Sequence, residues 1–174
     1  MITIAIIIFV FSSFFSNYQS QEKTQNNFEL KVGDIAPDFS LKDQNGKLRA
    51  LKSYRGQRVV LYYFPKADTP GWTKQSCGFR DIYNEYKREK IKVFGISFDS
   101  ISSLKNFKKK HNLPFDFLSD SKKEVAMKYG AKGSFWSKRI TFVISKKGKI
   151  EKIYKAINVN THAEKILDDI LEKN

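Results

Sequence analysis

The chain has 174 residues, of which 41% are hydrophobic and 14% aromatic, and its formal net charge is +14. This length suits one domain with a sizeable buried core, and the aromatic content excludes a chain that is disordered throughout. Only six of the 32 basic residues are Arg, and the basic residues are spread along the chain. The charge therefore predicts a lysine-rich solvated surface, and no specific nucleic-acid interface is expected.

The first residues differ from the rest of the chain. Residues 2–15 form an almost unbroken apolar run, which suits the core of a signal peptide and is short for a membrane span. We expect residues 1–20 to be a signal peptide or an uncleaved N-terminal anchor, and residues 21–28 to be a linker. A domain is expected over residues 29–174, in a protein exported to a periplasm or a secretory pathway.

Apolar patterns along the domain predict strands and helices in alternation. Strands are expected at 39–41, 47–49, 58–64, 92–98, 140–144 and 150–156. Helices are expected at 73–90, after the capping residues Asp99 and Ser100, at 121–129, and from Thr161 onward. The pairs Ser121 with Glu124 and Thr161 with Glu164 are typical of capping boxes. Residues 113–115 are expected only to close the second helix.

The order of these elements predicts the fold class. Strand, helix, strand and helix are followed by a hairpin and a last helix, which is typical of an α/β sandwich. The sheet should be mixed, because a hairpin is antiparallel, and helices should flank it. The continuous apolar runs at 58–64 and 92–98 predict central strands that are buried on both faces. This order is compatible with a thioredoxin-like fold.

The segment most informative about chemistry is 65–81, which reads PKADTPGWTKQSCGFRD. It leaves the end of a central strand and enters a helix, and sites in open α/β sheets lie at such junctions. The N-terminus of a helix offers free N–H groups and the positive end of the helix dipole. A thiolate placed there would be stabilised, and its pKa would be lowered.

This segment resembles the peroxiredoxin Q subfamily of the peroxiredoxins, also called bacterioferritin comigratory proteins. The subfamily often reads YPKDxTPGCTxEACxFRD, and this chain reads YFPKADTPGWTKQSCGFRD. Pro65, Thr69 and Cys77 match, and Trp72 stands where the family has its peroxide-reactive cysteine. Further matches occur at 32–39, 95–97, 113–115, 118–120 and 139–144, so the resemblance covers nearly all of the chain after residue 30.

The resemblance implies a thioredoxin-like fold and a role for each matched residue. A thiolate at position 72 would attack the peroxide, and the Thr69 hydroxyl would hydrogen-bond both the thiolate and the peroxide. Arg139 would bring positive charge to the same pocket, and Pro65 would shield it from water. Cys77 would be the resolving cysteine, which forms a disulfide with position 72 that thioredoxin reduces.

Two features of the sequence bear on that cycle. Positions 72 and 77 lie about 140° apart around an intact helix, so the first turns of the helix would have to unwind before a disulfide could close. Trp72 has no thiol, and its indole cannot reduce peroxide by this route. The chain with Trp72 is therefore expected to lack the normal catalytic cycle.

Three hypotheses about Trp72 remain open. The native protein carries Cys or selenocysteine at position 72, since one base separates a Cys codon from the Trp codon and UGA is read differently in different settings. Alternatively, the chain is a pseudo-peroxiredoxin that serves as a non-catalytic binding or scaffold module. In the third hypothesis, Cys77 acts alone as a peripheral thiol. A further alternative, from another class, is a basic protein attached to anionic lipid or nucleic acid.

The expected partners follow from the resemblance. They are hydrogen peroxide or an alkyl hydroperoxide as substrate and thioredoxin as reductant, and the protein is expected to be a monomer. No cofactor is expected, and His111 and His162 have no metal-ligand spacing. No membrane contact is expected other than an anchor formed by the N-terminal run.

Overall fold

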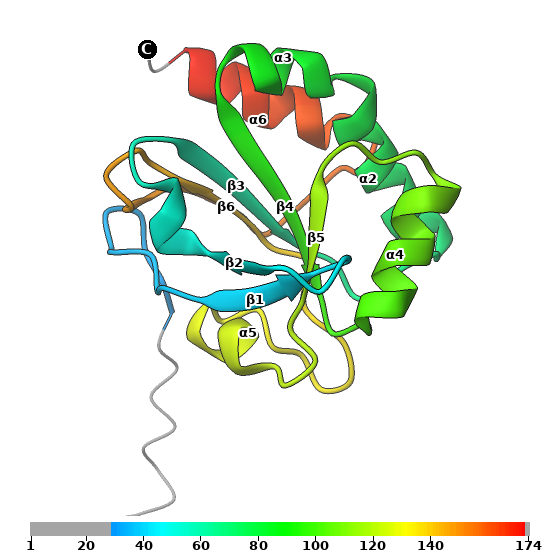
Figure 1. The fold of residues 1–174 in the computed structure, drawn as a ribbon. Helices are drawn as coiled ribbons and strands as arrows, with labels where there is room; N and C mark the ends of the chain where they lie inside the picture. The colour runs from blue at the N-terminus through cyan, green and yellow to red at the C-terminus, as the bar shows by residue number, and fades with distance from the viewer. Residues whose placement is uncertain (1–28, 173–174) are drawn as a thin grey trace, which may run out of the picture.

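The computed structural model describes residues 29–172, without the side chain of Trp72. The segment expected to be a signal peptide or anchor and the expected linker lie outside the described residues. Within residues 29–172, seven strands form one mixed sheet in the order β2-β1-β5-β4-β3-β6-β7 (Figure 1). The strands are β1 (Ser40–Asp43), β2 (Leu48–Ala50), β3 (Arg58–Tyr63), β4 (Ile91–Ser97), β5 (Asp116–Ser119), β6 (Thr141–Ile144) and β7 (Ile150–Tyr154).

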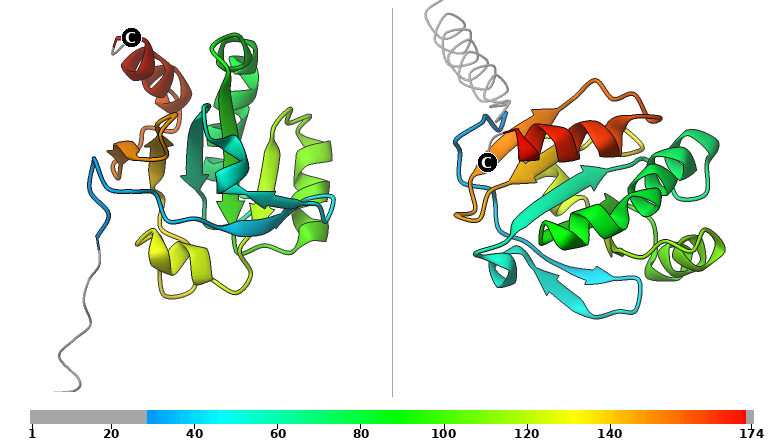
Figure 2. Two further views of the ribbon diagram at one scale, coloured as in Figure 1. Left: turned by 60° about the vertical axis from the view of Figure 1, so that its left-hand side comes forward. Right: turned by 90° about the horizontal axis from the view of Figure 1, so that it is seen from above.

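Helices cover both faces of this sheet (Figures 1 and 2). Their bounds are η1 (Leu51–Tyr54), α2 (Pro70–Asp81), α3 (Tyr83–Arg88), α4 (Ile101–Lys110), α5 (Glu124–Lys128) and α6 (His162–Leu171). One apolar cluster joins the sheet to α2, α3, α4 and α6, and it includes Phe79, Tyr86 and Ile166. A second cluster packs α5 and η1 on the opposite face, through Val125 and Leu51. The predicted α/β architecture is confirmed.

The two central strands agree with the apolar runs that predicted them. β3 pairs with β4 in parallel, with Val60 opposite Val93, and β3 also pairs with β6 in antiparallel. All residues of β3 after Arg58 are buried. Gly95 of β4 is required by packing, since a Cβ at this position would lie 2.8 Å from the Phe117 ring and from the Tyr62 hydroxyl.

The helix predicted over 73–90 is two helices. α2 ends at Asp81, and Ile82 has φ −113° and ψ 21°, which lie outside the α-helical region. The apolar spacing of Phe79, Ile82 and Tyr86 continues across this break, because all three side chains pack on the same core. Periodicity alone therefore could not reveal the break.

Two predicted helix caps were wrong in their bonding. α5 begins at Glu124 rather than at Ser121, and the carboxylate of Asp120 accepts hydrogen bonds from the N–H groups of Val125 and Ala126 at 3.3 and 2.7 Å. α6 does begin after Thr161, but the Thr161 side chain makes no cap hydrogen bond. Ser100 caps α4 as predicted, and it accepts from the N–H of Ser103 at 3.2 Å.

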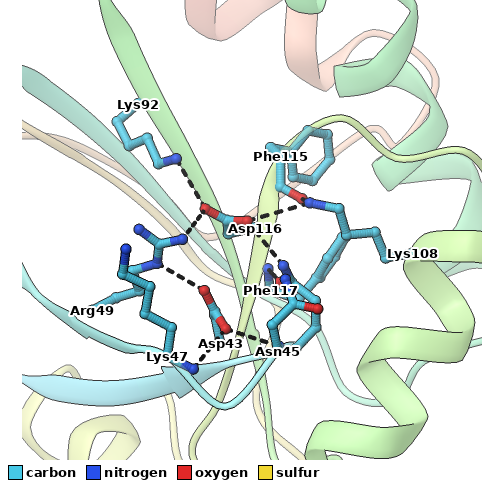
Figure 3. A network of polar contacts seen from close by, with 10 residues as sticks. Asp43, Asn45, Lys47, Arg49, Lys92, Lys108, Phe115, Asp116 and Phe117 are labelled. Atoms are coloured by element: carbon cyan, nitrogen blue, oxygen red, sulfur yellow. Dashed lines mark hydrogen bonds and ion pairs between the residues drawn. The ribbon is translucent and has the colours of Figure 1, made fainter.

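β5 was not predicted, because residues 116–119 carry no turn signal or long apolar run and pair only with strands distant in the sequence. A polar network fixes the β1–β2 hairpin to this strand (Figure 3). Asp116 of β5 accepts from Gln44 at 3.0 Å and lies 3.1 Å from Lys92, while Arg49 bridges Asp43 and Asp116 at 2.8 and 3.4 Å. Burial alone would raise the pKa of Asp116, but the hydrogen bond from Gln44 and the charges of Lys92 and Lys108 lower this pKa to about 2.

Candidate active site

The chain leaves β3 through a short loop that fixes the start of α2. The N–H of Ala67 donates to the Asp99 carboxylate at 2.8 Å, which ties the loop to the segment after β4. Asp68 has a positive φ of 62°, and its carboxylate lies 3.0 Å from Nε2 of His111. Thr69 is extended and occupies the N-cap, so Pro70 stands at the first helical position, where its missing N–H costs nothing.

Thr69 lies immediately before α2, which begins at Pro70, three residues earlier than the apolar pattern predicts. Its hydroxyl donates to the carbonyl oxygen of Lys66 at 3.2 Å. A hydroxyl has one proton, so the Thr69 oxygen can only accept while this bond lasts, and the donation to a thiolate that the resemblance implies would require the bond to Lys66 to break. Such an oxygen can receive an O–H from a small ligand at that place.

Position 72 lies in the first turn of α2. Gln75 and Ser76, three and four residues later, share its helix face, and both are buried. Ser76 is hydrogen-bonded to the Tyr62 hydroxyl of β3 at 3.0 Å. The face of α2 that carries Gln75 and Ser76 is therefore turned toward the sheet. The side-chain amide of buried Gln75 has no hydrogen-bond partner among the described residues.

Arg139 reaches the same place from a distant part of the chain. Its Nη2 lies 3.5 Å from the position that a Cβ on Gly71 would occupy, so the guanidinium contacts the first turn of α2. The side chain is half-buried, and this burial lowers the pKa of Arg139. A guanidinium remains charged at neutral pH even so, and it adds to the positive end of the α2 dipole. The site thus favours an anion.

His162 supports Arg139, and the sequence alone did not reveal this. It is the first residue of α6, as predicted, and its Nε2 lies 2.9 Å from Oγ1 of Thr141. Thr141 is the first residue of β6 and stands two residues after Arg139, so this bond holds α6 to the start of β6 close to Arg139. Burial, together with the Arg139 charge, lowers the pKa of His162 to about 4. The ring of His162 also packs on Phe79 of α2 at 6.1 Å.

Cys77 lies on the same helix as position 72 but not on the same face. It is half-buried, and α2 is continuous from Pro70 to Asp81. A separation of five residues places the two positions about 140° apart around the helix axis. The first turns of α2 must therefore open before any bond between positions 72 and 77 can form.

The comparisons with known proteins agree with this arrangement. A sequence model described as the AhpC/TSA family matches residues 32–153, more than half of the chain. The chain belongs to the AhpC/TSA family. Peroxiredoxin Bcp of Escherichia coli K12 is 42% identical over 151 residues, which cover 82% of this chain and 97% of that protein. Chloroplastic peroxiredoxin Q of Triticum aestivum is 44% identical over 129 residues, covering 72% of this chain and 59% of that protein.

The comparison with solved structures also finds a peroxiredoxin. The crystal structure of peroxidoxin BcpB from Mycobacterium tuberculosis superposes with a TM-score of 0.80 and 32% identity, covering 84% of this chain and 99% of that chain. The thioredoxin-like fold and the likeness to the peroxiredoxin Q branch of the AhpC/TSA family are therefore confirmed. The individual roles predicted for Pro65, Thr69, Trp72, Cys77 and Arg139 remain predictions.

The remaining expectations concern metals and membranes. Within residues 29–172, no group of three His, Cys, Asp or Glu side chains is placed to hold a metal ion. None of the helices in that part of the chain is long and apolar enough to cross a bilayer.

Proposed function

We propose that this protein is the scaffold of a thiol-dependent peroxidase of the peroxiredoxin Q type, active when position 72 carries Cys or selenocysteine. The observation that carries the proposal is the contact of Arg139 with the first turn of α2. It brings a fixed positive charge to the helix turn that contains position 72. Thiolate formation and peroxide cleavage both produce negative charge, which the positive charge of Arg139 would stabilise.

The proposed cycle has three balanced steps. The thiolate at position 72 attacks one peroxide oxygen and the O–O bond breaks, which gives a sulfenic acid and hydroxide or alkoxide; this leaving group takes a proton from solvent and departs as water or an alcohol. The Thr69 hydroxyl donates its one proton to the Lys66 carbonyl, so the Thr69 oxygen accepts a hydrogen bond from the O–H of the peroxide. The Cys77 thiolate then attacks the sulfenic sulfur, so an S–S bond forms and the S–O bond breaks; the hydroxide that leaves takes a proton from solvent to become water. A thioredoxin dithiol reduces this disulfide and is itself oxidised.

The chain with Trp72 cannot begin this cycle, because an indole is no thiolate. Cys77 does not replace a thiol at position 72. It lies in the second turn of α2, where the helix dipole stabilises a thiolate much less than in the first turn. The second candidate function is therefore a pseudo-peroxiredoxin, a non-catalytic binding or scaffold module, and Trp72 is the observation that favours it. The third reading, in which Cys77 acts alone, is the weakest for the same electrostatic reason.

A coupled assay tests the proposal. NADPH oxidation by thioredoxin reductase and thioredoxin is followed with hydrogen peroxide and with an alkyl hydroperoxide. Protein with Trp72 should give only the background rate, and Trp72→Cys should give a rate like that of a family member. Trp72→Cys combined with Cys77→Ser is the matched control, which should be oxidised but not recycled. A folded but inert Trp72→Cys protein would favour the pseudo-peroxiredoxin. The coding DNA at codon 72 and an intact mass show which residue the native protein carries.

We also propose that the protein is exported and monomeric. The apolar run at 2–15 supports export through a signal peptide or an N-terminal anchor. N-terminal sequencing of the native protein distinguishes these, because a cleaved leader removes the run. Sedimentation velocity of the mature protein tests the monomer, which should show one species at all concentrations.

A further inference from the structure

The loop before Arg139 forms a tight hairpin, residues 132–137, which we call the aromatic hairpin. Lys132 and Ser137 form an antiparallel bridge, and the N–H of Gly133 donates to the carbonyl of Trp136 at 3.0 Å. A Cβ on Gly133 would lie 2.3 Å from that carbonyl oxygen, so the turn can close this tightly only at a glycine. Phe135 and Trp136 are 81% and 51% exposed. The backbone thus holds two exposed aromatic side chains in a defined place.

The aromatic hairpin lies at the rim of the candidate active site. The Lys66 ammonium is 5.1 Å from the centre of the Trp136 ring, and Lys66 follows Pro65 in the loop that leads to α2. Arg139 is three residues beyond Trp136. Whatever binds the hairpin therefore stands next to the entrance of the site.

Three exposed lysines accompany the two aromatic side chains: Lys66, Lys132 and Lys138. In residues 29–172, none of the three ammonium groups is within ion-pair distance of a carboxylate. Aromatic rings with neighbouring cations suit an anionic bilayer surface, where rings settle among the headgroups and ammonium groups meet phosphates.

The carboxylate at the start of the described chain interacts with the charge of the residue that follows the hairpin. The pKa of Glu29 is lowered first by its hydrogen bond from Lys155, and the charge of Lys138 contributes. Lys138 directly follows the hairpin, so Glu29 is near it. The apolar run at 2–15 is separated from Glu29 by 13 residues, which can span at most about 45 Å. This connection favours a membrane over a second protein copy as the occupant.

We propose that the aromatic hairpin, together with Lys66, Lys132 and Lys138, docks on an anionic membrane surface. Docking holds the entrance of the candidate site at the level of the lipid headgroups. The proposal goes beyond the proposed peroxidase function and does not depend on the residue at position 72.

The test uses the full chain and its own fluorescence, because Trp72 and Trp136 are its two tryptophans. With Trp72→Phe, Trp136 is the sole reporter. Vesicles of phosphatidylcholine with phosphatidylglycerol should shift its emission to the blue, and lipids brominated near the headgroup should quench it. Vesicles of phosphatidylcholine alone should do neither. A control reporter, Leu171→Trp with both native tryptophans replaced by Phe, stands at the end of α6 and outside the hairpin; it should not respond although cosedimentation shows that this variant still binds the vesicles.

A second arm tests the lysines by cosedimentation with the same anionic vesicles. Replacing Lys66, Lys132 and Lys138 by Gln should weaken binding about tenfold or more. Replacing three exposed lysines elsewhere, Lys52, Lys105 and Lys109, removes the same charge and should have a much smaller effect. Three results would overturn the proposal. Vesicle binding without a response of Trp136 would indicate that the N-terminal run binds alone, and equal losses of binding for both triple variants would show that the three lysines have no special part. A concentration-dependent shift of the Trp136 emission without vesicles would indicate that a second copy of the chain covers the hairpin.

Discussion

The guanidinium of Arg139 lies 3.5 Å from the Cβ position of Gly71, although 68 residues separate the two in the chain. This contact exists because β6 pairs with β3, and β3 leads through Pro65 and Thr69 into α2. The end of β3 and the start of β6 therefore lie at one edge of the sheet. A helix start and a cation meet there, and this is the physical basis of the proposed site.

Arg139 should control the acidity of a thiol at position 72. In Trp72→Cys protein, Arg139→Ala should raise the pKa of that thiol and lower peroxidase kcat/KM about 100-fold or more, because one fixed donor and charge is lost. Thiol ionisation is followed by thiolate absorbance against pH. Arg139→Lys is the control, which keeps the charge and should lose less. An unchanged thiol pKa in the alanine variant would mean that Arg139 is only a surface residue.

His162 should make stability depend on pH. Its pKa is about 4 in the folded protein and 6.5 when exposed, so the unfolded chain binds a proton that the folded chain excludes between these values. Stability should therefore fall as the pH decreases from 6.5 toward 4, by about 3 kcal/mol at most. Urea unfolding of His162→Gln and of the parent protein is compared at about pH 7.5 and about pH 4.5. The parent should lose more stability than the variant. Equal losses would show that His162 does not titrate in this window.

Two glycines should respond oppositely to alanine. In Gly95→Ala the new methyl group would lie 2.8 Å from Phe117 and Tyr62, and we expect a loss of about 1–3 kcal/mol from overpacking. In Gly78→Ala the nearest atoms are 3.9 Å away, and the helix α2 should gain up to about 1 kcal/mol from the better helix former. Urea unfolding of both variants tests this pair. Equal effects would contradict the packing described around β4.

The sequence predicted the fold well where local patterns and packing agree. The run at 58–64 became β3, because a continuous apolar strand is a local signal, whereas the helix predicted from residue 73 begins three residues earlier, at Pro70. The break at Ile82 and the short strand β5 could not be predicted, since tertiary packing decides both. Asp120 replaced Ser121 as the group that bonds the start of α5, because the chain before α5 turns through a left-handed residue.

The candidate site was predicted in part. Pro65, Thr69 and Arg139 were singled out through a resemblance to a family, and the structure brings Thr69 and Arg139 to one helix start. His162 was missed as a support of Arg139, because a histidine in a helix first turn carries no sequence signal of what it contacts. The buried amide of Gln75 was missed for the same reason.

We propose that the site lacks only the thiol at position 72. The most direct test of this proposal is the disulfide state of purified Trp72→Cys protein after one equivalent of hydrogen peroxide, mapped by mass spectrometry. The account predicts a disulfide between positions 72 and 77 that thioredoxin reduces, which also requires α2 to open, since the two positions face apart on the intact helix. A folded variant whose two thiols stay reduced under peroxide would contradict the account.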